Sequence, residues 1–108
     1  MTKTVGILAK SGSKEIASTA KKIYHTIQRH GFFVVPDENL SKTGKLPGGK
    51  LITRIKADLL VTGGGDGTVL KAVREMPDPK TPILGVNMGR RGYLTEVDPS
   101  GFEDALVR

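Results

Sequence analysis

Short, mostly apolar runs alternate along this chain with longer stretches in which apolar residues recur every three or four positions. Such a run is typical of a strand covered on both faces, and the recurring spacing is typical of an amphipathic helix. Alternating strands and helices predict a parallel sheet with right-handed crossovers. We therefore expect an α/β fold, an open and mainly parallel sheet flanked by helices, with strands at Thr4–Ala9, Phe32–Val35, Ala57–Thr62 and Pro82–Asn87.

Two stretches between these runs are expected to be helices. The first begins after Ser13, a residue that can cap a helix, and ends near His30 and Gly31. Its apolar positions are Ile16, Ala17, Ala20, Ile23, Tyr24 and Ile27. The second covers residues 69–76 and is ended by the prolines that follow. Between them, residues 37–50 are rich in Pro, Gly, Asn, Ser and Lys and are expected to form a mobile surface loop, with a short helix over residues 51–55.

The length of 108 residues fits one compact domain. Near its end, Ser100 and Glu103 have the spacing of a capping box, which predicts a helix from about Gly101. Only about eight residues follow that point, fewer than the mean helix of about 11–12 residues. We interpret residues 1–108 as one α/β domain that is incomplete at its C-terminal end and belongs to a longer protein.

The composition narrows the class of protein. No apolar run approaches the roughly 20 residues that span a bilayer, and the first residues lead into a strand rather than a signal peptide. The chain has no cysteine, which excludes disulfides, thiolate metal sites and cysteine nucleophiles. A cytoplasmic protein with no membrane association is expected.

The positive charge is concentrated in the first half. Residues 1–56 carry 11 Lys and Arg against 3 acids, whereas residues 57–108 carry 6 against 8. A basic half of this kind suits a solvated helix face, phosphorylated small molecules or nucleic acid. Nucleic acid is the least favoured of the three, because the lysines are spread out and do not alternate with aromatic residues, of which this half has only Tyr24, Phe32 and Phe33.

A glycine-rich run, Gly63-Gly64-Gly65-Asp66-Gly67-Thr68, stands between the third strand and the second helix. Glycines there let backbone N–H groups approach phosphate oxygens, and the helix adds the positive end of its dipole. The run matches neither the Walker pattern nor the dinucleotide G-x-G-x-x-G pattern. The alternative interpretation is a tight turn in which Asp66 or Thr68 caps the helix.

The five residues from Gly64 to Thr68 resemble the GGDGT signature that NAD kinases share with diacylglycerol and sphingosine kinases. A second run, residues 87–96 (N-M-G-R-R-G-Y-L-T-E), resembles the NAD kinase pattern N-x-G-x-x-G-F-L-T/A-E, with Tyr93 in place of the usual Phe. Lipid kinases tend to have a P-x-G-T-x-N-D run there instead, and it is absent from this chain. The chain is therefore identified as resembling the N-terminal domain of the NAD kinase family, with a Rossmann-like sheet.

The resemblance implies a role for each residue of the two motifs. Asp66 would accept the 2'-hydroxyl proton of NAD or orient that hydroxyl, as phosphoryl transfer requires. The phosphate groups would be contacted by Gly64, Gly65, Gly67 and Thr68. The second motif would approach the NAD through Asn87, Gly89, Arg90, Gly92 and Tyr93. Tyr93 could equally well be a core residue instead of contacting the ligand. Arg90 could equally well be a surface charge instead of contacting phosphate.

The resemblance also implies cofactors and partners. The reaction would make NADP from NAD with ATP or polyphosphate as donor and Mg²⁺ or another divalent cation. No metal ligand is predicted among the residues of the chain, and the two histidines are assigned neither metal binding nor catalysis. The full-length protein would be a homo-oligomer. In NAD kinases a second, β-rich domain completes the site, so this chain alone is expected to be inactive. The alternatives are a lipid kinase domain and a non-catalytic nucleotide-binding module.

Overall fold

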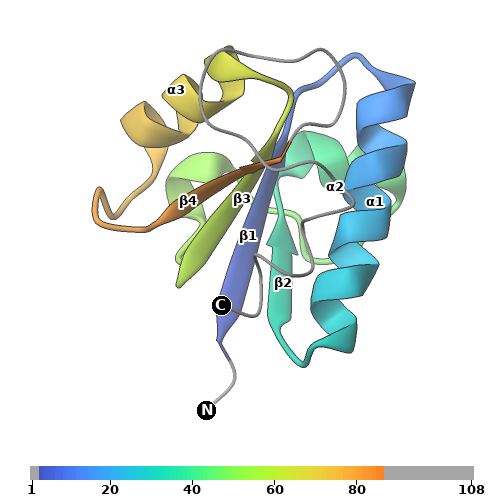
Figure 1. The fold of residues 1–108 in the computed structure, drawn as a ribbon, viewed down its shortest axis with the longest axis horizontal. Helices are drawn as coiled ribbons and strands as arrows, with labels where there is room; N and C mark the ends of the chain where they lie inside the picture. Colours follow the sequence, from blue (N-terminus) through green and yellow to red (C-terminus); the bar gives the residue numbers. More distant parts are fainter. Residues whose placement is uncertain (1–2, 87–108) are drawn as a thin grey trace.

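The computed structural model describes residues 3–86. In this part of the chain four strands form one sheet in the order β2-β1-β3-β4, and every neighbouring pair is parallel (Figure 1). The strands are β1 (Thr4–Ala9), β2 (Phe33–Pro36), β3 (Leu59–Gly63) and β4 (Ile83–Val86). The expected parallel α/β sheet is confirmed.

The helices are α1 (Lys14–Arg29), α2 (Glu38–Gly44) and α3 (Asp66–Glu75), with a 3-10 turn, η1, at Ile52–Arg54. Helix α1 has the predicted ends: the Ser13 hydroxyl accepts a hydrogen bond from the Ile16 N–H at 3.2 Å, and Gly31 has a positive φ of 85°. None of the helices that the structure describes is long and apolar enough to cross a membrane.

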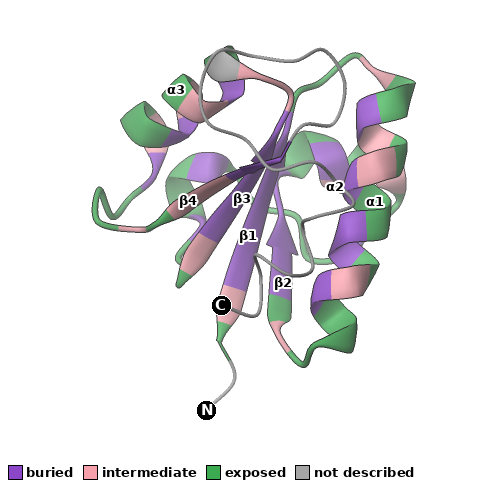
Figure 2. Ribbon diagram, in the orientation of Figure 1, coloured by how far each residue is buried: buried purple, intermediate pink, exposed green. Residues whose placement is uncertain are grey.

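Helices cover both faces of the sheet, so that the central strands are buried (Figure 2). On one face the core combines β1 residues such as Val5 and Ile7 with the apolar stripe of α1 and with Leu40 of α2. On the other face Leu8 and Leu60 pack with the η1 region and α3, through Ile52, Ile55, Ala72 and Met76. Alternate residues of each strand therefore enter different cores, as the two-residue period of a strand requires.

The connections make the sheet doubly wound. From β1 the chain passes through α1 to β2 on one side, and β3 then lies on the other side of β1. Helices α1 and α3, which follow the neighbouring strands β1 and β3, leave for opposite faces. The carboxyl ends of these two strands thus form the switch point of the sheet, where ligands of open α/β sheets bind.

The prediction of a surface loop over residues 37–50 is wrong for the first half of that range, which forms α2. Asp37 caps this helix by accepting a hydrogen bond from the Asn39 N–H at 3.1 Å, and buried Leu40 attaches it to the core. Lys45 ends it in the left-handed conformation, with φ 55°. The helix is only seven residues long and is stabilised by this packing, which local composition does not reveal.

Smaller boundaries also differ from the sequence expectation. Helix α3 begins at Asp66 rather than Val69, because Gly65 turns the chain and its carbonyl accepts the N–H groups of Thr68 and Val69. Strand β2 extends to Pro36, whose carbonyl accepts the Lys50 N–H at 3.1 Å. The short helix expected over residues 51–55 is confirmed as η1.

Candidate functional site

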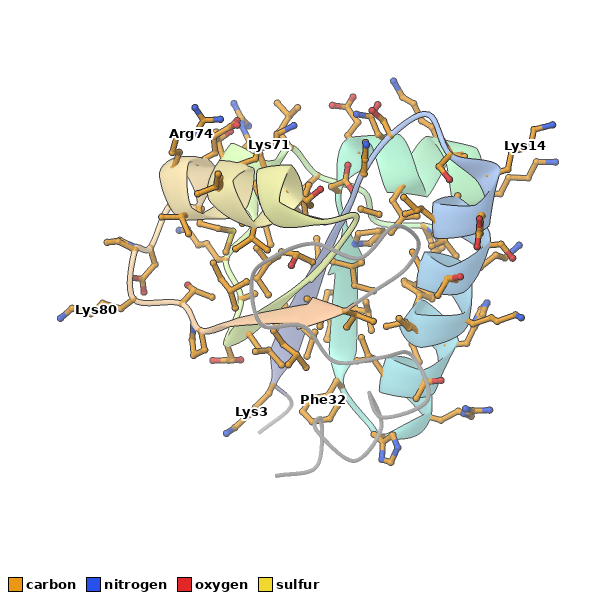
Figure 3. All side chains as sticks on the ribbon, turned by 45° about the horizontal axis from the view of Figure 1, so that its top comes forward. Lys3, Lys14, Phe32, Lys71, Arg74 and Lys80 are labelled. Atoms are coloured by element: carbon orange, nitrogen blue, oxygen red, sulfur yellow. The ribbon has the colours of Figure 1, made fainter. Side chains whose placement is uncertain are left out.

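A hollow of about 240 Å³ lies at the switch point of the sheet, and we call it the edge hollow. Its walls are the residues that follow β1, the residues that follow β2, and the loop and first turns between β3 and α3. Its lining is Leu8, Ala9, Lys10, Ser11, Asp37, Asn39, Gly64, Gly67, Thr68 and Lys71. Figure 3, which turns this edge toward the viewer, shows Lys71 and Arg74 on α3 at this end, with Lys3 and Phe32 at the opposite end.

The β3–α3 loop approaches the β1 end closely at Gly64. The Lys10 N–H donates to the carbonyl of Gly63 at 2.8 Å, which fixes the two loops against each other. A Cβ on Gly64 would lie 2.4 Å from the Lys10 Cβ and 2.9 Å from the Thr68 Oγ1, and the φ of Gly64 is +132°. Both the space and the backbone conformation therefore require glycine at this position.

Helix α3 starts at this loop and directs its N-terminus to the edge hollow. The first N–H groups of a helix have no acceptor within the helix, and they carry the positive end of its dipole. Gly67 adds no side chain between these amides and a ligand, and the hydroxyl of buried Thr68 lies beside them. The loop is thus suited to binding an anion such as phosphate.

Asp37 is the buried charged residue of the edge hollow, and sequence reasoning missed it. One of its carboxylate oxygens accepts the Ala9 N–H at 3.2 Å and the other accepts the Asn39 N–H at 3.1 Å. Its own N–H donates to the Ile7 carbonyl at 2.8 Å. Asp37 therefore ties the ends of β1 and β2 to the start of α2. The signal in the sequence is an aspartate directly after an apolar run, where an N-cap is expected.

Burial raises the pKa of the Asp37 carboxyl above its ordinary value of 3.8. The backbone N–H groups of Ala9, Leu40 and Asn39 oppose this shift, and so does the positive charge of Lys71. Removal from water dominates because it disfavours the charged form of the carboxyl.

Two lysines give the edge hollow its positive charge, and neither was predicted as a site residue. Lys10 directly follows β1, and Lys71 lies one turn beyond Gly67 on α3. Both positions could have been predicted from the sequence. Lys10 follows a parallel strand and so lies at the carboxyl edge of the sheet, and Lys71 is four residues after Gly67 and so shares its helix face. Lys10 did not stand out because basic residues are spread evenly through the first half of the chain, and Lys71 did not stand out because it occurs singly on a predicted helix.

The structure brings some of the sequence-predicted residues together. Gly64, Gly67 and Thr68 line the edge hollow, and Gly65 makes the turn that starts α3. The backbone of Asp66 begins α3, and the structure describes no more of this residue than its backbone. The second motif also lies outside the described residues, with Asn87, Gly89, Arg90, Gly92 and Tyr93. The preceding strand β4 ends at Val86, which pairs with Gly63 at the same edge of the sheet.

The described residues were compared with the ligand sets that usually hold a metal ion. No group of three or more His, Cys, Asp or Glu residues is placed there to hold one. Both oxygens of Asp37 already accept backbone hydrogen bonds.

A doubly wound sheet with a glycine-rich loop at its switch point defines an open α/β domain of the kind whose ligands bind at the carboxyl ends of the strands. Comparison with known proteins identifies the family. The family model for the ATP-NAD kinase N-terminal domain matches residues 51–108, more than half of the chain. The chain therefore belongs to the NAD kinase family.

Individual relatives agree with this assignment. The chain is 34% identical to an NAD kinase of Marinobacter nauticus, over 98% of this chain and 37% of that protein. It is 36% identical to an NAD kinase of Methanopyrus kandleri, over 96% of this chain and 38% of that protein. The chain thus spans little more than a third of the length of these curated relatives. A crystal structure of yeast NADH kinase complexed with NADH has the same fold, with a TM-score of 0.81, 18% identity and 98% of this chain covered.

Proposed function

We propose that the protein containing this chain is an NAD kinase, which transfers a phosphoryl group to the 2'-hydroxyl of NAD. The observation that carries the proposal is the edge hollow, in which the GGDGT loop meets two lysines at the switch point of the sheet. Family membership supports the acceptor, because the relatives are NAD kinases and the structural neighbour was crystallised with NADH.

The described residues would bind the phosphate chain of the donor. Gly64, Gly67, Thr68 and Lys71 line one space. Their backbone N–H groups, hydroxyl and ammonium group would be the donors to phosphate oxygens. Phosphoryl transfer depends mainly on positioning and on stabilising the charge of the transferred group. Mg²⁺ or another divalent cation would arrive with the donor and neutralise part of that charge.

Asp66 would be the general base. In the proposed step the 2'-oxygen of NAD forms a bond to the terminal phosphorus of the donor, the bond from that phosphorus to the bridging oxygen breaks, and the shortened donor leaves. The proton of the 2'-hydroxyl passes to the Asp66 carboxylate. The second motif would hold the NAD through Asn87, Gly89, Arg90, Gly92 and Tyr93, beside the edge at which β4 ends. We propose a cytoplasmic, homo-oligomeric full-length enzyme.

The test is an assay of the full-length protein with Mg²⁺, donor and either NAD or diacylglycerol as acceptor. We expect NADP, detected by an NADP-specific dehydrogenase, and no phosphorylated lipid. Phosphorylation of the lipid without NADP would support the lipid kinase alternative and contradict the proposal. If neither product forms while nucleotide still binds, a non-catalytic nucleotide-binding module is the better interpretation.

A further inference from the structure

Helix α1 carries a row of basic side chains along its outer face. Its apolar residues pack on the sheet, and the opposite side of the helix is exposed (Figure 2). Residues separated by three, four, seven or eight positions share one face of a helix. This spacing places the lysines and the arginine of α1 on the exposed side. We call this set the basic stripe: Lys14, Lys21, Lys22 and Arg29.

The charge of the basic stripe is not compensated within the part of the chain that the structure describes. Helix α1 has a single acid, Glu15, and none of the four cations takes part in an ion pair there, whereas Lys42 of α2 lies 3.5 Å from Glu38. The guanidinium group of Arg29 donates to the neutral hydroxyl of Thr26 at 3.1 Å. With a rise of 1.5 Å per residue, the stripe presents its positive charges over about 22 Å.

The kind of partner follows from the other residues of this face. Every exposed residue of α1 is polar or charged, with Ser18, His25 and Gln28 beside the cations. A helix that binds a membrane surface inserts an apolar face, and the apolar face of α1 is buried in the core. A stable protein interface usually has an apolar or aromatic centre. Lysine, arginine, serine and glutamine are instead residues through which proteins contact the phosphate and sugar groups of nucleic acids.

The same face favours a double strand over a single strand. Proteins that bind single strands without sequence preference stack the bases on aromatic side chains, and the aromatic residue of α1, Tyr24, is buried. In a duplex the bases are already stacked on one another. Each strand of a duplex offers a phosphate about every 3.4 Å along the axis, so a stripe of about 22 Å could follow about six phosphates.

From this charge pattern we propose that the outer face of α1 binds the phosphate backbone of double-stranded nucleic acid without sequence preference. The wide spacing of the lysines along the chain disfavours nucleic acid at the level of sequence, but the helical period gathers them into one row. None of the four cations lines the edge hollow, so this surface is separate from the proposed catalytic site.

The experiment titrates the full-length protein into a fluorescently labelled DNA duplex of about 20 base pairs, followed by anisotropy at about 50 to 200 mM KCl. Lys21→Gln combined with Lys22→Gln should lower the affinity at about 100 mM salt roughly 10- to 100-fold. The slope of log K against log salt should become shallower by about two, because each lost phosphate contact releases about one counterion fewer. Glutamine has nearly the helix propensity of lysine, so α1 should remain intact.

The matched control is Arg74→Gln combined with Lys80→Gln, which removes the same charge elsewhere. Arg74 belongs to α3, on the opposite face of the sheet from α1, and Figure 3 shows Lys80 and Lys14 at opposite sides of the molecule. This variant should keep the wild-type affinity and slope. Equal losses in the two double variants would mean that net charge alone matters and would overturn the proposal.

Two further outcomes would also overturn it. One is a wild-type slope in the folded Lys21→Gln and Lys22→Gln variant. The other is binding to vesicles rich in phosphatidylserine with no binding to the duplex, which would assign the stripe to an anionic membrane. Urea unfolding of both double variants shows whether they are folded. NADP formation, assayed on the same samples, tests the proposed function separately.

Discussion

At the scale of single residues, the candidate site depends on positions where only one kind of side chain fits. Gly64 is held where a Cβ would contact Lys10, and Asp37 is buried with both carboxylate oxygens hydrogen-bonded to backbone N–H groups. At such positions the side chain must suit both the local backbone conformation and the atoms packed around it. Substitutions there should separate catalysis from stability.

Asp66→Asn in the full-length enzyme should lower the rate of NADP formation about 10²-fold or more, since the amide cannot accept the 2'-hydroxyl proton. The two side chains have nearly the same size, so the midpoint of urea unfolding should move little. The control is Asp78→Asn, which changes the same chemical group in the loop after α3, where the Asp78 carboxylate accepts the Lys80 N–H. A turnover of Asp66→Asn near that of Asp78→Asn would reduce Asp66 to a turn residue.

Gly64→Ala should destabilise the protein by about 1–3 kcal/mol and weaken nucleotide binding. The new methyl group would force apart the loops joined by the Lys10 N–H bond to the Gly63 carbonyl. Gly12→Ala is the matched control, because Gly12 also has a positive φ, of 88°, but no atom lies within 4 Å of its Cβ position. The measurements are urea unfolding and nucleotide titration. Equal losses of stability and of nucleotide affinity in the two variants would contradict a role for crowding at Gly64.

At the scale of elements, Asp37 joins β1, β2 and α2 into one unit beneath the edge hollow. Helix α2 is short, and its stability comes from this cap and from the packing of Leu40. The edge hollow takes one wall from this unit and another from α3. Its shape should therefore respond to the charge of the Asp37 carboxyl.

The raised pKa of Asp37 predicts how its contribution to stability depends on pH. Between 3.8, the ordinary value, and the higher folded value, the native protein binds more protons at this group than the unfolded chain. The contribution of Asp37 to the free energy of unfolding is therefore greatest below 3.8 and falls as the pH rises toward the folded pKa.

The measurement is urea unfolding of wild type and Asp37→Asn at about pH 3, below the ordinary value of the carboxyl, and at about pH 7. The stability of wild type relative to the variant should be larger at the lower pH. Asp78→Asn, which makes the same change at an exposed carboxylate in the loop after α3, serves as a control for general electrostatic effects. A difference that grows with pH would mean that hydrogen bonding, and not burial, dominates the pKa of Asp37.

At the scale of the whole molecule, the chain corresponds to little more than a third of its curated relatives. We expect the 108 residues alone to fold and to bind nucleotide weakly, because the loop and lysines of the edge hollow are all present. NADP formation at a useful rate is not expected, since in-line transfer requires that NAD also be fixed, and a misplacement of about 1 Å can cost about 10²-fold. Comparable turnover by this chain and the full-length protein, under the same Mg²⁺ and ATP, would contradict this prediction.

The sequence by itself determined the features that are local in the chain. The apolar runs predicted the strands within one or two residues, and the period of the apolar positions together with Ser13 predicted both ends of α1. The position of the glycine-rich run between a strand and a helix followed in the same way, because glycine content and periodicity act over a few residues.

Only the tertiary structure decided which side chains share the site. Lys10, Asp37 and Lys71 come from three separate segments, and they meet because the strand order β2-β1-β3-β4 places the three strand ends side by side. Helix α2 was missed for a related reason, since its composition is that of a loop and its stability comes from the Asp37 cap and the burial of Leu40. A short helix gains more from tertiary packing than from its own propensity, and a hollow between loops is formed by packing alone.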